Sequence, residues 1–103
     1  IPLYVVSAGK NWGLGSKVPM VDSVLLDLST LNKIRKYNES LAYLTVEAGV
    51  SFRQAVQYLS KINSPLMLDT LGSTPDASIV GNTVERGHGM ALYADRFNFV
   101  CGM

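Results

Sequence analysis

The chain has 103 residues, which is enough for one small domain and excludes several domains within this stretch. Nine Lys and Arg residues against eight Asp and Glu residues leave a formal net charge of +1, and the absence of any long run of like charge argues against a nucleic-acid stripe or a polybasic membrane patch. Only 17% of the residues are charged while 48% are hydrophobic, so we expect another domain or a ligand to cover part of the surface.

The first half of the chain predicts three strands and a short helix. Leu3–Val6 is an apolar run that ends at a glycine-rich stretch, which is typical of a buried strand. Ser23–Leu28 is the second predicted strand, and a Ser-Thr pair then offers a cap for a short helix over residues 29–37. Leu41–Val46 is the third predicted strand.

A longer helix follows and carries the clearest local signal. Ser51 and Gln54 have the spacing of a capping box, in which each side chain bonds the backbone of the other residue. Apolar residues then recur at helical spacing at Phe52, Ala55, Val56, Leu59 and Ile62. The pattern predicts a helix over residues 51–62, which "NSP" ends.

The last third of the chain predicts two strands and one helix. Leu66–Leu68 is a short strand, and Thr74 caps a helix that runs through Ile79 and Val84 and ends at Gly87. The final residues, "NFVCGM", have the pattern of a strand. Strands interleaved with two or three helices indicate an α+β or α/β fold.

Both ends of the chain lie in sequence typical of a core. The chain begins "IPL" and stops inside the last predicted strand, so we expect a partial domain over residues 1–103 that is truncated at both ends. The single cysteine, Cys101, has no partner for an internal disulfide and fits a reducing compartment, which favours the cytoplasm. No apolar stretch is long enough to span a bilayer.

The stretch "SAGKNWGLG" follows the first strand and is suited to an anion. Gly9, Gly13 and Gly15 give backbone N–H groups the freedom to point at one ligand, while Lys10 adds a charge and Asn11 adds hydrogen bonds. The spacing matches neither G-x-G-x-x-G nor a Walker loop, and a strand follows instead of a long helix. A glycine-rich hairpin without a ligand therefore remains an alternative.

Two further segments of small residues follow predicted strands. "LGSTPDASIVGN" offers hydroxyl groups before a helix start, and Gly49 comes directly after the third strand. A mononucleotide would need only one such segment. Three segments that converge would suit a long ligand such as a dinucleotide.

Three stretches together resemble a known family. "PLYVVSAGKNWGLG", "LTVEAGVSFRQAVQYL" and "SIVGNTVERGHGMALYADRFNFVCGM" are similar, in this order and over nearly the whole chain, to the FAD-binding domain of the vanillyl-alcohol oxidase and p-cresol methylhydroxylase family. The resemblance is strongest with the branch that acts on 4-substituted phenols. It implies an α+β FAD-binding subdomain, with FAD as the cofactor and Gly49 in a turn near the diphosphate loop. The implied FAD-binding residues are Ser7, Ala8, Gly9, Lys10, Asn11, Trp12, Gly13, Gly15, Leu71, Gly72, Ser73, Thr74, Ser78, Gly81 and Asn82.

The chain departs from the family pattern at Ala48, where Pro is usual, and at His88, where an aliphatic residue is usual. His88 raises three alternatives: a covalent flavin link, a metal site with Asp95 and Cys101, and a polar loop residue near the cofactor. The family's flavin attachment belongs to segments outside this match, and the spacing fits no common metal pattern, so the loop residue is favoured.

The resemblance also implies a function for the intact protein. It would oxidise a 4-substituted phenol or another alcohol by hydride transfer to the flavin, with oxygen or a cytochrome as electron acceptor. Its partners would be the missing remainder of the FAD domain, a substrate cap domain, a small-molecule substrate and a second copy of itself. This chain alone would then be inactive, and no catalytic residue can be named from it. The competing hypothesis is a phosphate-binding or protein-interaction module with no redox role.

Overall fold

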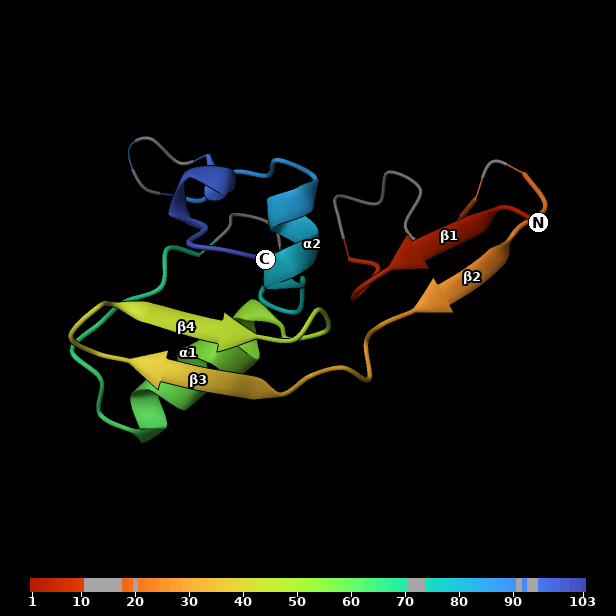
Figure 1. Cartoon of the computed structure of the whole chain (residues 1–103). Helices are drawn as coiled ribbons and strands as arrows, with labels where there is room; N and C mark the ends of the chain where they lie inside the picture. The colour runs from red at the N-terminus through yellow and green to blue at the C-terminus, as the bar shows by residue number, and fades with distance from the viewer. Residues whose placement is uncertain (11–17, 20, 71–73, 91, 93–94) are drawn as a thin grey trace.

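The computed structural model describes residues 1–10, 18–19, 21–70, 74–90, 92 and 95–103. Four strands, two α-helices and a short 3-10 helix follow one another in these ranges, which confirms the α+β fold class (Figure 1). The fold is elongated, with extents of 46 × 27 × 22 Å. Among the described residues, no helix has the length and apolar character needed to cross a membrane.

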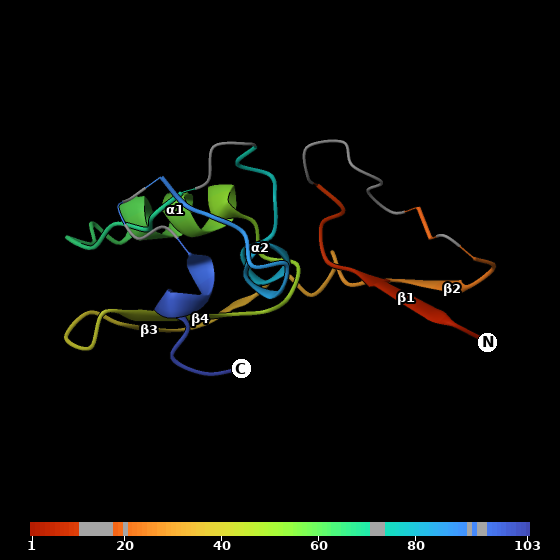
Figure 2. The same cartoon turned by 90° about the horizontal axis from the view of Figure 1, so that it is seen from above.

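The first two strands form a parallel pair. β1 (Leu3–Val6) lies beside β2 (Val24–Asp27) in the register Leu3↔Val24 to Val6↔Asp27, so both predicted strands are confirmed, the second in a shorter form. The carboxyl end of β1 points toward α2, and the two views agree that α2 lies between this pair and the rest of the molecule (Figures 1 and 2). The loop after β1 is therefore delivered to the start of α2.

The next two strands form an antiparallel hairpin. β3 (Ile34–Asn38) pairs with β4 (Tyr43–Val46), which confirms the third predicted strand. The helix predicted over residues 29–37 is wrong, because the apolar spacing there covers little more than one turn and β3 gains its backbone partners from β4. Glu47 further fixes the start of β3 by accepting hydrogen bonds from the Lys33 amide and the Arg35 guanidinium.

Helix α1 (Phe52–Lys61) follows the hairpin and lies against one of its faces (Figure 2). Its predicted capping box is present, since Ser51 accepts from the Gln54 amide and the Gln54 side chain accepts from the Ser51 amide. The chain leaves the helix through Asn63, whose φ is 52°. The buried apolar core lies around the start of α1, at Val50, Phe52, Ala55 and Ala77, with Val6 at the end of β1.

Helix α2 (Ile79–Val84) begins later in the chain than the sequence predicts. Its cap is Ser78 instead of Thr74, because Thr74 accepts the amides of Asp76 and Ala77 and so closes a turn of its own. The left-handed residue after the helix is Arg86, with φ of 53°, instead of Gly87. The guanidinium of Arg86 stacks on the Phe97 ring, 4.9 Å from its centre, which favours this conformation.

Two predicted strands are wrong. Residues 66–68 have no strand partner among the described residues. Of the final predicted strand, residues 98–99 belong to the 3-10 helix η1 (Arg96–Phe99), and residues 100–103 form no strand. Asp95 caps η1 by accepting the Phe97 amide, a local bond that the apolar pattern does not reveal.

Candidate cofactor-binding site

The hydroxyl of Ser78 joins two of the three segments that the sequence singles out. It donates to the Ala48 carbonyl at 2.8 Å, and it accepts from the Gly81 amide at 2.8 Å. The Ile79 amide also donates to the Val50 carbonyl at 3.1 Å. The turn after β4 is therefore fastened to the first turn of α2. Ser78 caps α2 by accepting the Gly81 amide, and its hydroxyl proton is donated to the Ala48 carbonyl.

The third segment, which follows β1, reaches the same place through Ser7. A Cβ atom added at Gly81 would lie 2.4 Å from the Ser7 hydroxyl oxygen, so a side chain there would require the Ser7 hydroxyl to move. Gly9 follows with a φ of 61°, a left-handed conformation that favours glycine. The ends of β1 and β4 and the start of α2 thus converge, as the three sequence segments predict.

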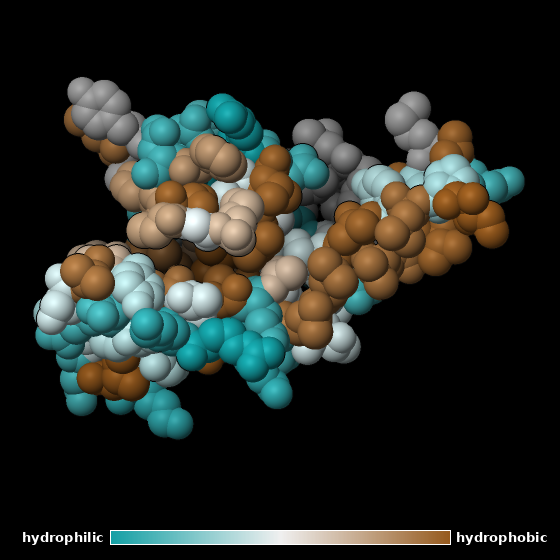
Figure 3. Space-filling view, viewed as in Figure 1, coloured by the Kyte–Doolittle hydropathy of each residue, from teal (hydrophilic) through white to brown (hydrophobic). Residues whose placement is uncertain are grey.

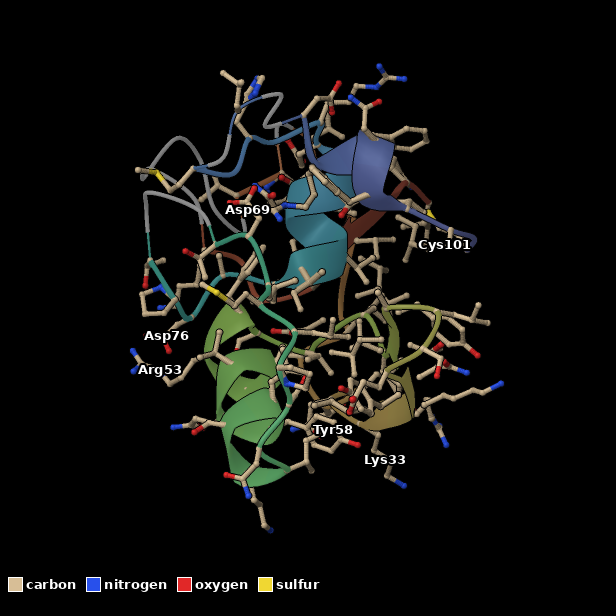
Figure 4. The ribbon with its side chains drawn as sticks, turned by 90° about the vertical axis from the view of Figure 1, so that its left-hand side faces the viewer. Lys33, Arg53, Tyr58, Asp69, Asp76 and Cys101 are labelled. Carbon is tan, nitrogen blue, oxygen red and sulfur yellow. The ribbon has the colours of Figure 1, made fainter. Side chains whose placement is uncertain are left out.

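The described start of the loop after β1, residues 7–10, contains backbone amides without a partner among the described residues. Within the described ranges, the amides of Ala8, Gly9 and Lys10 donate to no carbonyl or side chain. The pKa of the Asp76 carboxyl lies below its ordinary value, mainly because Arg53 donates hydrogen bonds to it, and the Lys10 cation adds to this effect. Figure 4 shows the Arg53 and Asp76 side chains next to each other. A cation and unpaired amides at a glycine turn are what a diphosphate requires.

The structure describes eight of the predicted FAD-binding residues, namely Ser7, Ala8, Gly9, Lys10, Thr74, Ser78, Gly81 and Asn82. Seven others lie outside the described residues, namely Asn11, Trp12, Gly13, Gly15, Leu71, Gly72 and Ser73. Ser7, Ser78 and Gly81 are brought together. The Asn82 side chain accepts a hydrogen bond from Arg96, and a direct contact of any of these residues with FAD stays a prediction.

His88 lies in a bridge with Asp95, which pairs the two backbones in antiparallel fashion. Cys101 is exposed. In the part of the chain that the structure describes, no three His, Cys, Asp or Glu side chains gather as a metal site would require.

Arg96 is a residue that the sequence reasoning missed. It is only 3% exposed, and it contacts both α2 and the segment around Asp69. A signal was present, since an arginine stands directly before the largely apolar and aromatic stretch "FNFV". An arginine is buried only where polar groups can bond it, and the partners of Arg96, Asn82 and Asp69, are distant in the sequence.

Comparisons with known proteins agree with this geometry. A family model described as "FAD binding domain" matches residues 1–103. A 1'-carboxy-chondrochloren decarboxylase from Chondromyces crocatus is 49% identical over 104 residues, which cover 100% of this chain and 19% of that protein. A crystal structure of p-cresol methylhydroxylase with substrate bound matches with a TM-score of 0.87 and 40% identity, over 95% of this chain and 19% of the other. A 4-ethylphenol oxidase from Gulosibacter chungangensis matches with a TM-score of 0.83 and 38% identity, over 92% of this chain and 18% of the other.

The chain spans about a fifth of the length of these relatives. The match of the family model over residues 1–103 shows the family of this chain. The chain belongs to the FAD binding domain family, and its fold is that of the FAD-binding domains of the vanillyl-alcohol oxidase and p-cresol methylhydroxylase type.

Proposed function

We propose that the full-length protein oxidises a 4-substituted phenol, or another alcohol, with FAD as cofactor. FAD, when bound, supplies the acceptor for the hydride that leaves the substrate. The phenolic substrate class is supported by the names of two relatives, p-cresol methylhydroxylase and 4-ethylphenol oxidase. The remaining four-fifths of the protein would complete the FAD domain and supply the substrate cap.

The residues of this chain would bind and orient the cofactor. The amides of Ala8 and Gly9 and the Lys10 cation would hold the diphosphate, while Gly81 leaves its side of the site free of side chains. The observation that carries the proposal is the convergence of the Ser7, Ala48 and Gly81 segments at one point. A chain that only bound a single phosphate would not need all three.

The test uses the full-length protein and its visible absorbance. We expect the purified protein to be yellow, or to become so when FAD is added. Addition of p-cresol or 4-ethylphenol without oxygen should bleach the flavin band, whereas 4-methylanisole, which has no free phenol group, should not. A colourless protein that takes up no FAD would contradict the FAD role. Uptake of FAD without bleaching by either phenol would contradict the substrate class alone.

Oxidation coupled to decarboxylation is a second candidate. The observation that favours it is the 49% identity with a protein named 1'-carboxy-chondrochloren decarboxylase. Under this candidate, a 4-hydroxyphenyl compound with a carboxylate on its side chain would release carbon dioxide as the flavin band bleaches. Bleaching without carbon dioxide release would support the simple oxidation instead.

A further inference from the structure

Arg96 is a buried cation that connects several distant segments. Its Nε donates to the Asn82 Oδ1 at 3.1 Å, and its Nη1 donates to the Asp69 carbonyl at 2.5 Å. The guanidinium also stacks on the Phe52 ring, with 4.9 Å between the Cζ and the ring centre. Through its own amide Arg96 donates to the Gly87 carbonyl at 3.0 Å. One side chain therefore bonds α2 and the segment that leads to Thr70, while it packs on the first residue of α1.

The residues around Arg96 are closely packed. A Cβ atom at Gly89 would lie 1.7 Å from an Asp69 carboxylate oxygen and 2.8 Å from the Arg96 Nη2. A Cβ atom at Gly87 would lie 1.9 Å from the Asn82 Nδ2. The Asn82 carboxamide is thus held between Arg96 and the turn at Gly87. Figure 4 shows Asp69 beside α2, at the end far from Tyr58.

Among the described residues, two nitrogens of the Arg96 guanidinium have hydrogen-bond acceptors and the third has none. The nearest carboxylate oxygen, on Asp69, is 3.7 Å from Nη1, too far for a strong hydrogen bond. Nη2 is buried with no acceptor among the residues that the structure describes. A buried guanidinium nitrogen without an acceptor is costly, and proteins tolerate such groups mainly at functional sites.

Asn82 links Arg96 to the cofactor-binding site. Asn82 directly follows Gly81, whose backbone faces the Ser7 hydroxyl and whose amide bonds to Ser78. A rotation or shift of the short helix α2 would move Gly81 against Ser7. We propose that Arg96 is a positioning residue of the FAD site, which acts through Asn82 to hold Gly81 against the loop after β1. This inference rests on the proposed function, because it concerns the same FAD site.

The experiment compares variants of the full-length protein. Arg96→Lys keeps the charge but offers no planar fork for two acceptors, and Asn82→Ala removes the Oδ1 acceptor. Each should weaken FAD binding by about tenfold in Kd, measured on apoprotein that circular dichroism shows to be folded. The double variant should lose no more than either single variant, because both changes break the same link. Arg35→Lys, at an exposed ion pair with Glu47, is the matched control and should keep the Kd of the unchanged protein.

A second measurement separates positioning from general stability. The phosphorus-31 resonances of FAD bound at saturation report the geometry of its diphosphate. Arg96→Lys and Asn82→Ala should shift them in the same way, while Arg35→Lys should leave them in place. Losses that add in the double variant, or an unchanged Kd in either single variant, would overturn the inference. If Arg96→Lys does not fold, Arg96→Gln takes its place, because Asn82 is itself an implied FAD-binding residue: a weakened Kd with shifted resonances in Arg96→Gln supports the inference, and any other result overturns it. Failure of the unchanged protein to bind FAD would instead defeat the proposed function, and this inference with it.

Discussion

Gly49 shows how strongly a single residue can depend on the absence of a side chain. A Cβ atom there would lie 2.6 Å from the carbonyl oxygens of both Leu28 and Ser29. Backbone atoms cannot rotate away as a side chain can, so the turn after β4 would have to shift. We expect Gly49→Ala to lower the free energy of unfolding of the full-length protein by roughly 1–3 kcal/mol, measured by urea denaturation.

The control for this prediction is another glycine of the same chain. A Cβ atom at Gly102 meets no atom within 4 Å in this structure. Gly102→Ala should therefore change the free energy of unfolding by less than about 0.5 kcal/mol. Equal effects of the two substitutions would show that the turn at Gly49 is not packed as described.

Ala42 has the opposite problem, since a side chain stands where glycine is favoured. Its φ is 51°, at the end of the hairpin loop between β3 and β4, and it is exposed. We expect Ala42→Gly to raise the free energy of unfolding by about 0.5–1 kcal/mol, because glycine adopts this conformation without steric strain. Ser40→Gly in the same loop, where φ is not positive, should give no gain in thermal unfolding experiments.

Some residue-level features could be predicted from the sequence and others could not. The capping box of Ser51 and Gln54 depends on two residues three positions apart, so the sequence shows it directly. The left-handed conformation of Arg86 depends on Phe97, a residue in another element. A local rule assigns that conformation to the neighbouring Gly87 and is wrong for this reason.

At the scale of elements, the same distinction separates right from wrong predictions. β1 and α1 carry their own signals, an apolar run before glycines and a capped amphipathic pattern. β3 contains Arg35 and Lys36 and has no clear apolar alternation, so only its pairing with β4 identifies it as a strand. The final segment has a strand pattern, but its first two residues belong to η1, which Asp95 caps.

The β3–β4 hairpin also has a pH dependence that can be measured. The pKa of Glu47 is below its ordinary value of 4.5, first because the Lys33 amide donates to its carboxylate and then because Arg35 is its ion-pair partner. A carboxyl whose pKa is lower in the folded state stabilises the fold above its unfolded pKa, and this contribution is lost as the pH falls through the folded pKa. We expect the melting temperature of the full-length protein to fall less steeply below pH 4.5 in Glu47→Gln.

Glu85→Gln is the matched control for the pH experiment. Glu85 is exposed at the end of α2, and its carboxylate forms no hydrogen bond or ion pair within the described residues. The melting temperature of Glu85→Gln should fall with pH below 4.5 as steeply as that of the unchanged protein. If the melting temperature of Glu47→Gln fell with pH as steeply as that of the unchanged protein, the contacts of Glu47 would not stabilise the fold.

At the scale of the whole molecule, the sequence predicts the meeting of the three small-residue segments but not what holds them together. Glycine and serine positions after strands are visible as a pattern, and their convergence is confirmed at Ser7, Ser78 and Gly81. Arg96 lies 14 residues from Asn82 and 27 from Asp69, so no local spacing relates it to them. Contacts of this kind depend on the complete fold.

One face of the parallel pair of β1 and β2 is apolar and exposed to solvent in this chain. Leu3, Val5, Val24 and Leu26 share one side of the pair, and all four are exposed. Figure 3 shows hydrophobic residues gathered over β1 and β2. Parallel strands occur almost only where both faces are covered. Since the chain spans about a fifth of the length of its relatives, we expect other parts of the full-length protein to cover this face.

Leu26→Ala in the full-length protein tests that cover. Leu26 is 42% exposed in this chain, and a leucine this accessible would cost little when shortened. If the rest of the protein packs on the face, the substitution should lower the free energy of unfolding by about 2–5 kcal/mol, as for a core leucine. Leu41→Ala at the hairpin tip, where the side chain is 70% exposed, removes the same atoms outside the face and should cost less than about 0.5 kcal/mol. Similar small costs at both positions would mean that β1 and β2 remain open to solvent in the whole protein, and the low charge of this chain would then need another explanation.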